Sequence, residues 1–230
     1  MANASVVAID GFKEAKRVNE GALAAAEKRA LVWMAERTPR AISSDHLSAL
    51  GVGAMALAGA CYWASASQRA WLLGVVVALG LNWLGDSLDG TLARVRNQQR
   101  PRYGFYLDHV LDAAGVSFLL GGLALSGYVH GYIALGLLVA YLLLMIEAAL
   151  ATYTLGVFRM SFAWFGPTEL RIVLALGTLS LWHFRTVGVL GERYQVFDVG
   201  GAIAIAGMLA AAVVSAARNT RALYRQEPLR

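Results

Sequence analysis

The stretch DSLDGTLARVRNQQRPRYGFYLDHVLD, residues 86–112, decides the fold that we expect for this chain. It places aspartates and arginines between two apolar runs, residues 70–85 and 113–146, which contain no Asp, Glu, Lys or Arg. Charges gathered into short clusters between long apolar runs are typical of a polytopic membrane protein. The sequence therefore predicts membrane helices on both sides of this polar stretch.

The composition of the whole chain agrees with this prediction. Of its 230 residues, 58% are hydrophobic and 15% are charged, whereas about a quarter of the residues in a soluble domain are charged. The net charge of +5 comes from basic residues beside hydrophobic runs, a placement that indicates anionic lipid headgroups and argues against nucleic acid as a partner. Residues 1–40 have no compact apolar segment, so we expect no cleaved signal peptide.

The apolar segments predict an all-α polytopic membrane protein with six transmembrane helices, because a helix needs about 20 apolar residues to cross a bilayer. The run at 113–146 is too long for one span, and the turn-forming sequence SGYVHG divides it at residues 126–131. The fifth span is short, which places Glu169 and Arg171 on it or at its mouth. The expected spans are residues 47–66, 70–94, the two helices on either side of 126–131, 172–184 and 199–217.

A single domain is expected over residues 1–230, with the helix bundle at 46–218 between a cytoplasmic N-terminal segment, 1–45, and a cytoplasmic tail, 219–230. Residues 20–37 combine strong helix formers with scattered charges, which favours an amphipathic helix at the membrane interface. A short solvated helix is the alternative. Pro39 disfavours helix at Thr38 and ends the segment.

The distribution of lysine and arginine predicts the orientation in the membrane. With the N-terminus inside, the cytoplasmic segments hold most basic residues and the other side keeps Arg69, Arg185 and Arg193. Both termini are therefore expected in the cytoplasm. A bacterial inner or cell membrane is the expected location.

Four aspartates are candidates for the active site. Asp86 and Asp89 are three residues apart, and Asp108 and Asp112 are four apart, so each pair shares one face of its helix. The two helices run antiparallel around a basic loop, which brings all four carboxylates to a similar depth. Four such groups repel one another unless cations neutralise them, and oxygen ligands favour Mg²⁺ or Mn²⁺, with Ca²⁺ as a further option. Two such ions suit phosphoryl transfer. The alternative is that the aspartates flank the spans and face water.

The pattern D-x-x-D-G-x-x-A-R-x9-G-x-x-x-D-x-x-x-D, which begins at Asp86 and ends at Asp112, resembles the signature of the CDP-alcohol phosphotransferase family. The motif itself covers about thirty residues. The expected arrangement of six helices is similar to that of the family over most of the chain. It implies that an alcohol hydroxyl attacks the phosphorus of a CDP-linked donor and that CMP leaves.

The resemblance also implies roles for individual residues. The metal ligands would be Asp86, Asp89, Asp108 and Asp112, holding two divalent cations, and Asp112 would also be the general base. The CDP-binding residues would be Asp86, Gly90, Ala93, Arg94 and Gly104, with the small residues leaving room for the nucleotide and Arg94 holding diphosphate charge.

Weaker candidates for binding the alcohol acceptor are Arg159, Glu169, Arg171 and Glu147. Glu169 and Arg171 belong to the segment GPTELR, residues 166–171, which is also ordinary for the start of a helix. Arg159 also suits a role in setting the membrane topology. Glu147 lies within a span, where it either lines the acceptor pocket or hydrogen-bonds to another helix. The four histidines lack metal-ligand spacing, and Cys61 suits a packing role.

We expect CDP-diacylglycerol as the donor and a small hydrophilic alcohol as the acceptor. The reverse assignment, CDP-choline or CDP-ethanolamine with diacylglycerol, is the close alternative. A divalent-cation transporter or channel, and a purely structural family member, are alternatives from other classes. Membrane lipids are expected partners, and the small-residue helix faces permit a homodimer.

Overall fold

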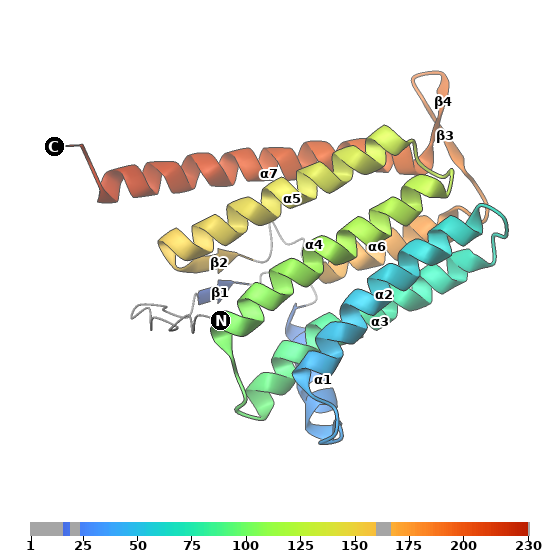
Figure 1. Cartoon of the computed structure of the whole chain (residues 1–230). Helices are drawn as coiled ribbons and strands as arrows, with labels where there is room; N and C mark the ends of the chain where they lie inside the picture. Colours follow the sequence, from blue (N-terminus) through green and yellow to red (C-terminus); the bar gives the residue numbers. More distant parts are fainter. Residues whose placement is uncertain (1–15, 19–23, 160–166, 230) are drawn as a thin grey trace, which may run out of the picture.

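The computed structural model describes residues 16–18, 24–159 and 167–229, and most of these residues are helical (Figure 1). In chain order the helices are α1 (Ala24–Arg37), α2 (Ser44–Ser65), α3 (Trp71–Val95), α4 (Pro101–Leu125), α5 (Gly131–Leu155), α6 (Pro167–Ser180) and α7 (Val196–Gln226). Strands β1 (Lys16–Val18) and β2 (Val157–Arg159) pair in parallel, and β3 (Thr186–Val189) and β4 (Glu192–Gln195) form an antiparallel hairpin.

Local sequence signals explain several helix ends. The Ser43 hydroxyl accepts a hydrogen bond from the His46 amide at 3.3 Å, and the His46 ring accepts one from the Ser43 amide at 3.2 Å. This reciprocal cap begins α2. Pro101 stands in the first turn of α4, where its missing N–H costs nothing. Gly156 ends α5 in the left-handed conformation, with φ of 68°, which glycine adopts at low cost.

The membrane-span prediction is correct in part. Among the described residues, five helices (α2, α3, α4, α5 and α7) are long and apolar enough to cross a membrane. The division at residues 126–131 is confirmed, since α4 ends and α5 begins there. The expected span at 172–184 corresponds to α6, which has 14 residues and is too short by itself to cross about 30 Å of hydrocarbon. Six spans are therefore not established.

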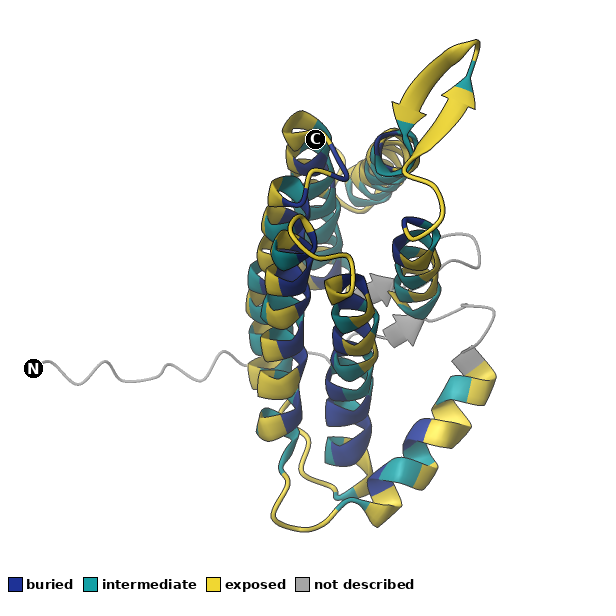
Figure 2. Cartoon of the chain, turned by 90° about the vertical axis from the view of Figure 1, so that its right-hand side faces the viewer, coloured by how far each residue is buried: buried dark blue, intermediate teal, exposed yellow. Residues whose placement is uncertain are grey.

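Helix α7 has 31 residues and continues through most of the expected tail at 219–230, because residues 218–226 include good helix formers. The cytoplasmic location of this tail stays a prediction. The two small sheets depart from a purely all-α architecture. The β3–β4 hairpin turns through Leu190 and Gly191, both at positive φ, and Figure 2 shows it projecting from the bundle with its residues mostly exposed.

Helices α2, α3 and α4 form the tightest part of the bundle because glycines let their backbones meet. A Cβ on Gly85 of α3 would lie 2.6 Å from the Gly51 nitrogen of α2. A Cβ on Gly122 of α4 would collide with the backbone of Gly59 on α2. Glycines predict close helix contacts at Gly51, Gly53, Gly59 and the pair Gly121 and Gly122. The structure confirms these contacts at Gly51, Gly59 and Gly122. The prediction fails at Gly53 and Gly121, where a Cβ would meet no atom of the described residues within 4 Å.

Helices α5 and α7 run parallel along the side of this core (Figure 1). At their starts the His130 amide donates to Asp198 Oδ1 at 2.8 Å, and further along Asn219 of α7 donates to Glu147 of α5 at 2.7 Å. Because the two helices are parallel, the chain that joins the end of α5 to the start of α7 must run back to the end of the bundle where α5 begins. Helix α6 follows this return path, with Arg171 beside Asp86 and Thr178 bonded to Tyr62 at 2.5 Å.

Helix α1 packs beside α3 at the end of the bundle where α2 and α4 begin, which we call the aspartate end. Its buried Leu31 and Ala35 join a small apolar cluster with Leu47, Leu88 and Leu92. The link to α2 is fixed by Arg96, whose guanidinium donates to three carbonyls. They belong to Ile42 (2.6 Å), Thr38 (2.8 Å) and Pro39 (2.9 Å).

Replacing Arg96 with glutamine is expected to loosen α1 from the bundle. The three carbonyls would lose a charged donor, at a cost of about 2 kcal/mol. Trypsin cleavage after Arg37 and Arg40 should then become several-fold faster, while Arg69→Gln at the opposite end should leave that rate unchanged. Equal cleavage rates in the two variants would show that Arg96 does not hold this link.

Candidate active site

The four aspartates come together at the aspartate end. Asp86 and Asp89 lie near the end of α3, and Asp108 and Asp112 follow the start of α4. The charges of Asp86, Asp89 and Asp108 all act on Asp112, and those of Asp86 and Asp108 act on Asp89. Asp89 is buried, Asp86 and Asp108 are half-buried, and Asp112 is exposed. The antiparallel helix pair therefore produces the acidic cluster expected from the spacing.

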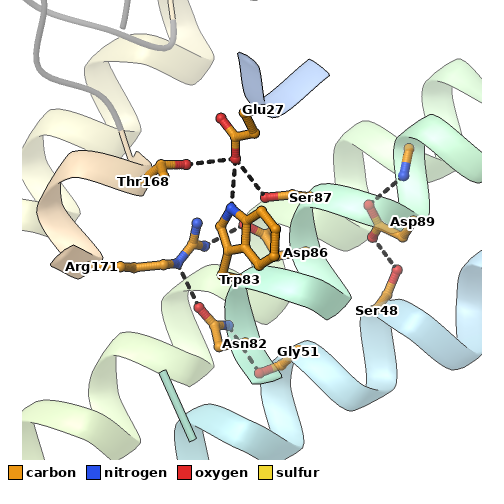
Figure 3. Close-up of polar contacts among 11 residues, drawn as sticks. Glu27, Ser48, Gly51, Asn82, Trp83, Asp86, Ser87, Asp89, Thr168 and Arg171 are labelled. Atoms are coloured by element: carbon orange, nitrogen blue, oxygen red, sulfur yellow. Dashed lines mark hydrogen bonds and ion pairs between the residues drawn. The ribbon is translucent and has the colours of Figure 1, made fainter. Parts of the chain in front are cut away.

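Asp86 is held by a side chain from another helix, α6, which Asn82 of α3 supports (Figure 3). The Arg171 guanidinium of α6 forms an ion pair with the Asp86 carboxylate, and Arg171 Nε donates to Asn82 Oδ1 at 2.8 Å. Asn82 in turn donates to the Gly51 carbonyl of α2 at 3.0 Å. Asn82 thus connects α2 to Arg171, and it places a guanidinium against the acidic cluster.

Asp89 is oriented by bonds to both of its oxygens (Figure 3). Ser48 of α2 donates its hydroxyl to Oδ2 at 2.6 Å, and the Gly90 amide donates to Oδ1 at 2.5 Å. These donors stabilise an ionised carboxylate at a buried position. Helices α2, α3, α4 and α6 therefore all contribute to the cluster.

The residues expected to bind the nucleotide lie on the same two helices. The Arg94 guanidinium donates to the Thr91 hydroxyl at 3.0 Å, one turn beyond Gly90. At Gly104, an added Cβ would meet no atom within 4 Å in the part of the chain that the structure describes. Internal packing therefore does not require glycine at position 104, and its role in binding the nucleotide stays a prediction.

The aspartates suit a divalent cation by their chemistry, since four carboxylates supply the hard oxygen ligands that Mg²⁺ and Mn²⁺ prefer. Their orientations are a different matter. In the described ranges, no three His, Cys, Asp or Glu side chains converge on one ion position. Asp86 faces Arg171, while Asp89 faces Ser48. The donor set fits the metal, and the metal-binding roles of the four residues stay predictions.

The weaker candidates are placed differently. Arg171 lies at the cluster, and Glu169 is in the first turn of α6. Glu147 bonds to Asn219 of α7, which agrees with the interhelical alternative for this carboxylate. Arg159 closes strand β2, and its side chain lies outside the described part of the structure. Among the described contacts of these four residues, that of Arg171 with Asp86 reaches the aspartates.

Three of the histidines and the cysteine have local structural roles. His109 bonds to the Phe105 carbonyl at 2.8 Å, His46 caps α2, and His130 contacts Asp198. Cys61 is a free thiol buried in the apolar core. These contacts agree with the structural and packing roles that the sequence favours.

Several residues of the site were missed by the sequence analysis. Asn82, Ser48 and Tyr141 all approach the cluster, and Tyr141 of α5 lies within electrostatic range of Asp86 and Asp112. Asn82 stands one helical turn before Asp86 in an otherwise apolar run, which is a signal that the sequence does contain. Glu27 of α1 is a further member, with bonds to α3 and α6.

Comparison with known proteins agrees with this geometry. The family model for CDP-alcohol phosphatidyltransferases matches residues 47–217, a range that includes most of α2, all of α3 to α6 and most of α7. Comparison with curated proteins gave no match. The family transfers a phosphate group from a CDP-alcohol to another alcohol and belongs to phospholipid synthesis in membranes. With the match over most of its length and the acidic cluster in place, this chain is a membrane transferase of the CDP-alcohol phosphatidyltransferase family.

Proposed function

We propose that this protein transfers a substituted phosphate group from CDP-diacylglycerol to the hydroxyl of a small hydrophilic alcohol and releases CMP. The observation that supports this most strongly is the meeting of Asp86, Asp89, Asp108 and Asp112 beside the Arg171 guanidinium. Four carboxylates at the end of membrane helices cost stability, so such a cluster indicates a functional site.

The four aspartates would hold two divalent cations, Mg²⁺ or Mn²⁺, which would supply positive charge for the diphosphate and for the negative charge on the oxygens of the reacting phosphate. Asp89, oriented by Ser48 and Gly90, presents a fixed carboxylate. Arg94 lies one turn beyond Gly90 and would bind diphosphate oxygens through its guanidinium. Gly90, Ala93 and Gly104 leave room for the cytidine to approach the backbone.

Asp112 is the proposed general base, since it is exposed and lies one turn beyond Asp108. Its carboxylate would take the proton from the acceptor hydroxyl as the oxygen attacks the donor phosphorus next to diacylglycerol. The bond between this phosphorus and the bridging oxygen breaks, and CMP leaves with the electron pair. General base catalysis of this kind contributes about 10² to 10⁴ in rate.

The acceptor would bind on the side of the cluster that α6 forms. Arg171 provides a guanidinium at this place and would contact a phosphate on the acceptor, as would Arg159, with Glu169 in the same first turn of α6. A phosphorylated acceptor matches these arginines, which supports CDP-diacylglycerol as the donor. Glu147 is the weakest member of this set because Asn219 already bonds to it.

We infer six membrane crossings, with the fifth at residues 172–184, which include most of α6. Helices α5 and α7 are parallel, so the chain must cross back between them. The aspartate end then carries the basic residues of α1, of the α3–α4 loop and of the last turns of α7, which supports a cytoplasmic active site and cytoplasmic termini. Helix α1 would lie at the membrane interface.

Substituting alanine for Gly104 is expected to weaken donor binding without harming the fold. The added methyl meets no described atom within 4 Å and improves helix propensity by roughly 0.5–1 kcal/mol, but it would occupy space that the nucleotide needs. We expect the KM for the CDP donor to rise about tenfold, equivalent to roughly 1.4 kcal/mol, at unchanged or higher thermal stability. Gly80→Ala on α3 is the control, because an added Cβ there also meets no described atom within 4 Å. An unchanged KM would exclude Gly104 from the nucleotide site.

The central experiment is a CMP-release assay on the purified full chain in lipid nanodiscs. CDP-diacylglycerol, Mg²⁺ or Mn²⁺ and a panel of alcohols and alcohol phosphates are the substrates. Release that requires both metal and one alcohol supports the proposal and names the acceptor. Release from CDP-choline or CDP-ethanolamine with diacylglycerol would reverse the donor assignment. Mn²⁺ uptake into liposomes without CMP release would favour a transport function.

A further inference from the structure

The Glu27 carboxylate joins three helices at one point (Figure 3). Its Oε1 atom accepts hydrogen bonds from the Trp83 indole of α3 at 2.6 Å, from the Thr168 hydroxyl of α6 at 2.7 Å and, more weakly, from the Ser87 hydroxyl of α3 at 3.4 Å. Because an indole N–H is a donor only, the direction of its bond is certain. Glu27 is thus an acceptor that connects α1, α3 and the first turn of α6.

Neighbouring positions on α3 and α6 carry the contacts of the active site. Along α6, Thr168 precedes Arg171 by three residues, which is about one helical turn. Along α3, Trp83 and Ser87 each directly follow a residue that faces Arg171, namely Asn82 and Asp86. Glu27 and Arg171 therefore make two adjacent polar connections between α3 and α6. One of them includes α1, and the other includes the aspartate cluster.

The docking of α1 does not depend on Glu27 alone. Leu31 and Ala35 bury its apolar side against α2 and α3, and Arg96 fixes the link that follows it. Removing the carboxylate should therefore leave α1 in place. What it removes is the connection to Thr168, the described hydrogen bond that ties α1 to the start of α6.

We propose that Glu27 is a positioning residue, which holds the first turn of α6 against α3 and thereby keeps the Arg171 guanidinium at Asp86. It acts through Thr168 and Arg171 and need not touch the substrate. This inference rests on the proposed function in one respect, namely that Asp86 and Arg171 belong to the site of phosphate transfer. The link from Glu27 to α6 is itself independent of the reaction.

The first test compares variants in the CMP-release assay. Glu27→Ala and Thr168→Val should each lower kcat/KM about tenfold, an effect in the range of one hydrogen bond to a charged group. The Glu27→Ala, Arg171→Gln double variant should have the same kcat/KM as Arg171→Gln alone, because both changes remove the same positioned guanidinium. Thr168→Ser keeps the hydroxyl donor and should recover most of the loss. Glu36→Gln is the matched control on α1, where the side chain is 59% exposed.

A second test does not use activity. In protein labelled with 5-fluorotryptophan, the ¹⁹F resonance of Trp83, identified by its loss in Trp83→Phe, reports on the bond to Glu27. Thr168→Val should shift this resonance, although Thr168 has no direct bond to Trp83, while Thr168→Ser and Glu36→Gln should leave it unmoved. A shift in a protein that releases no CMP from any donor would support the Glu27 link and reject the proposed function.

Two results would overturn the inference in an active protein. One is a kcat/KM for Glu27→Ala within twofold of the wild-type value. The other is a loss in the Glu27→Ala, Arg171→Gln double variant equal to the product of the two single losses, because independent effects multiply. Identical ¹⁹F spectra for wild type and Thr168→Val would overturn it in any preparation.

Discussion

Replacing Asp112 with asparagine is expected to lower kcat for CMP release about a thousandfold, which is the middle of the range for loss of a general base. Asparagine has nearly the same shape but cannot accept a proton from the acceptor hydroxyl. Because Asp112 is exposed, the substitution leaves no buried polar group unpaired, and the thermal stability should stay close to that of the wild type.

The control for this change must remove a negative charge from the same end of the molecule. Asp45→Asn does so, since Asp45 lies in the first turn of α2 and pairs with Arg100 at the surface. It should retain most of the activity. Measurement of kcat at saturating donor and acceptor distinguishes a proton-transfer defect from weak binding. A kcat for Asp112→Asn within tenfold of the wild-type value would exclude this residue as the general base.

Substituting alanine for Gly122 is expected to be the most damaging change to the fold. The new methyl would overlap the backbone of Gly59 on α2. No rotamer change relieves a collision with backbone, so α2 and α4 must separate. We expect a loss of about 3 kcal/mol or more, at the upper end of the usual cost of overpacking.

The adjacent glycine provides a matched control. A Cβ on Gly121 meets no atom within 4 Å among the described residues, so Gly121→Ala should change stability by less than about 1 kcal/mol. Thermal unfolding in detergent, followed by gel filtration to detect aggregation, compares the two variants directly. Equal stability of the two variants would mean that α2 and α4 do not meet at Gly59.

The sequence predicts the helices well where the signal is local. The turn at 126–131 and the continuation of α3 through Asp86 and Asp89 both follow from neighbouring residues. The fifth span is where this reasoning was least successful. A helix of 14 residues, such as α6, lacks the length on which span prediction depends, and its path through the bundle is fixed by contacts with α2 and α3.

The aspartate cluster was also accessible from the sequence, because spacings of three and four residues fix which side chains share a helix face. The arrangement of charges within the cluster was not. Arg171 reaches Asp86 from 85 positions away, and Thr168 reaches Glu27 from 141 positions away. The periodicity of a single segment contains no information about contacts between residues so far apart in the sequence.

The sequence by itself therefore determined the membrane helices, their polar ends and the two aspartate pairs, since hydrophobic length and helical periodicity are properties of consecutive residues. The tertiary structure alone decided that Asn82 holds Arg171 beside Asp86, that Gly122 rather than Gly121 contacts α2, and that Glu27 ties α1 to α6. These features depend on how helices pack against one another, and packing sets the rotation and depth of each helix relative to its neighbours.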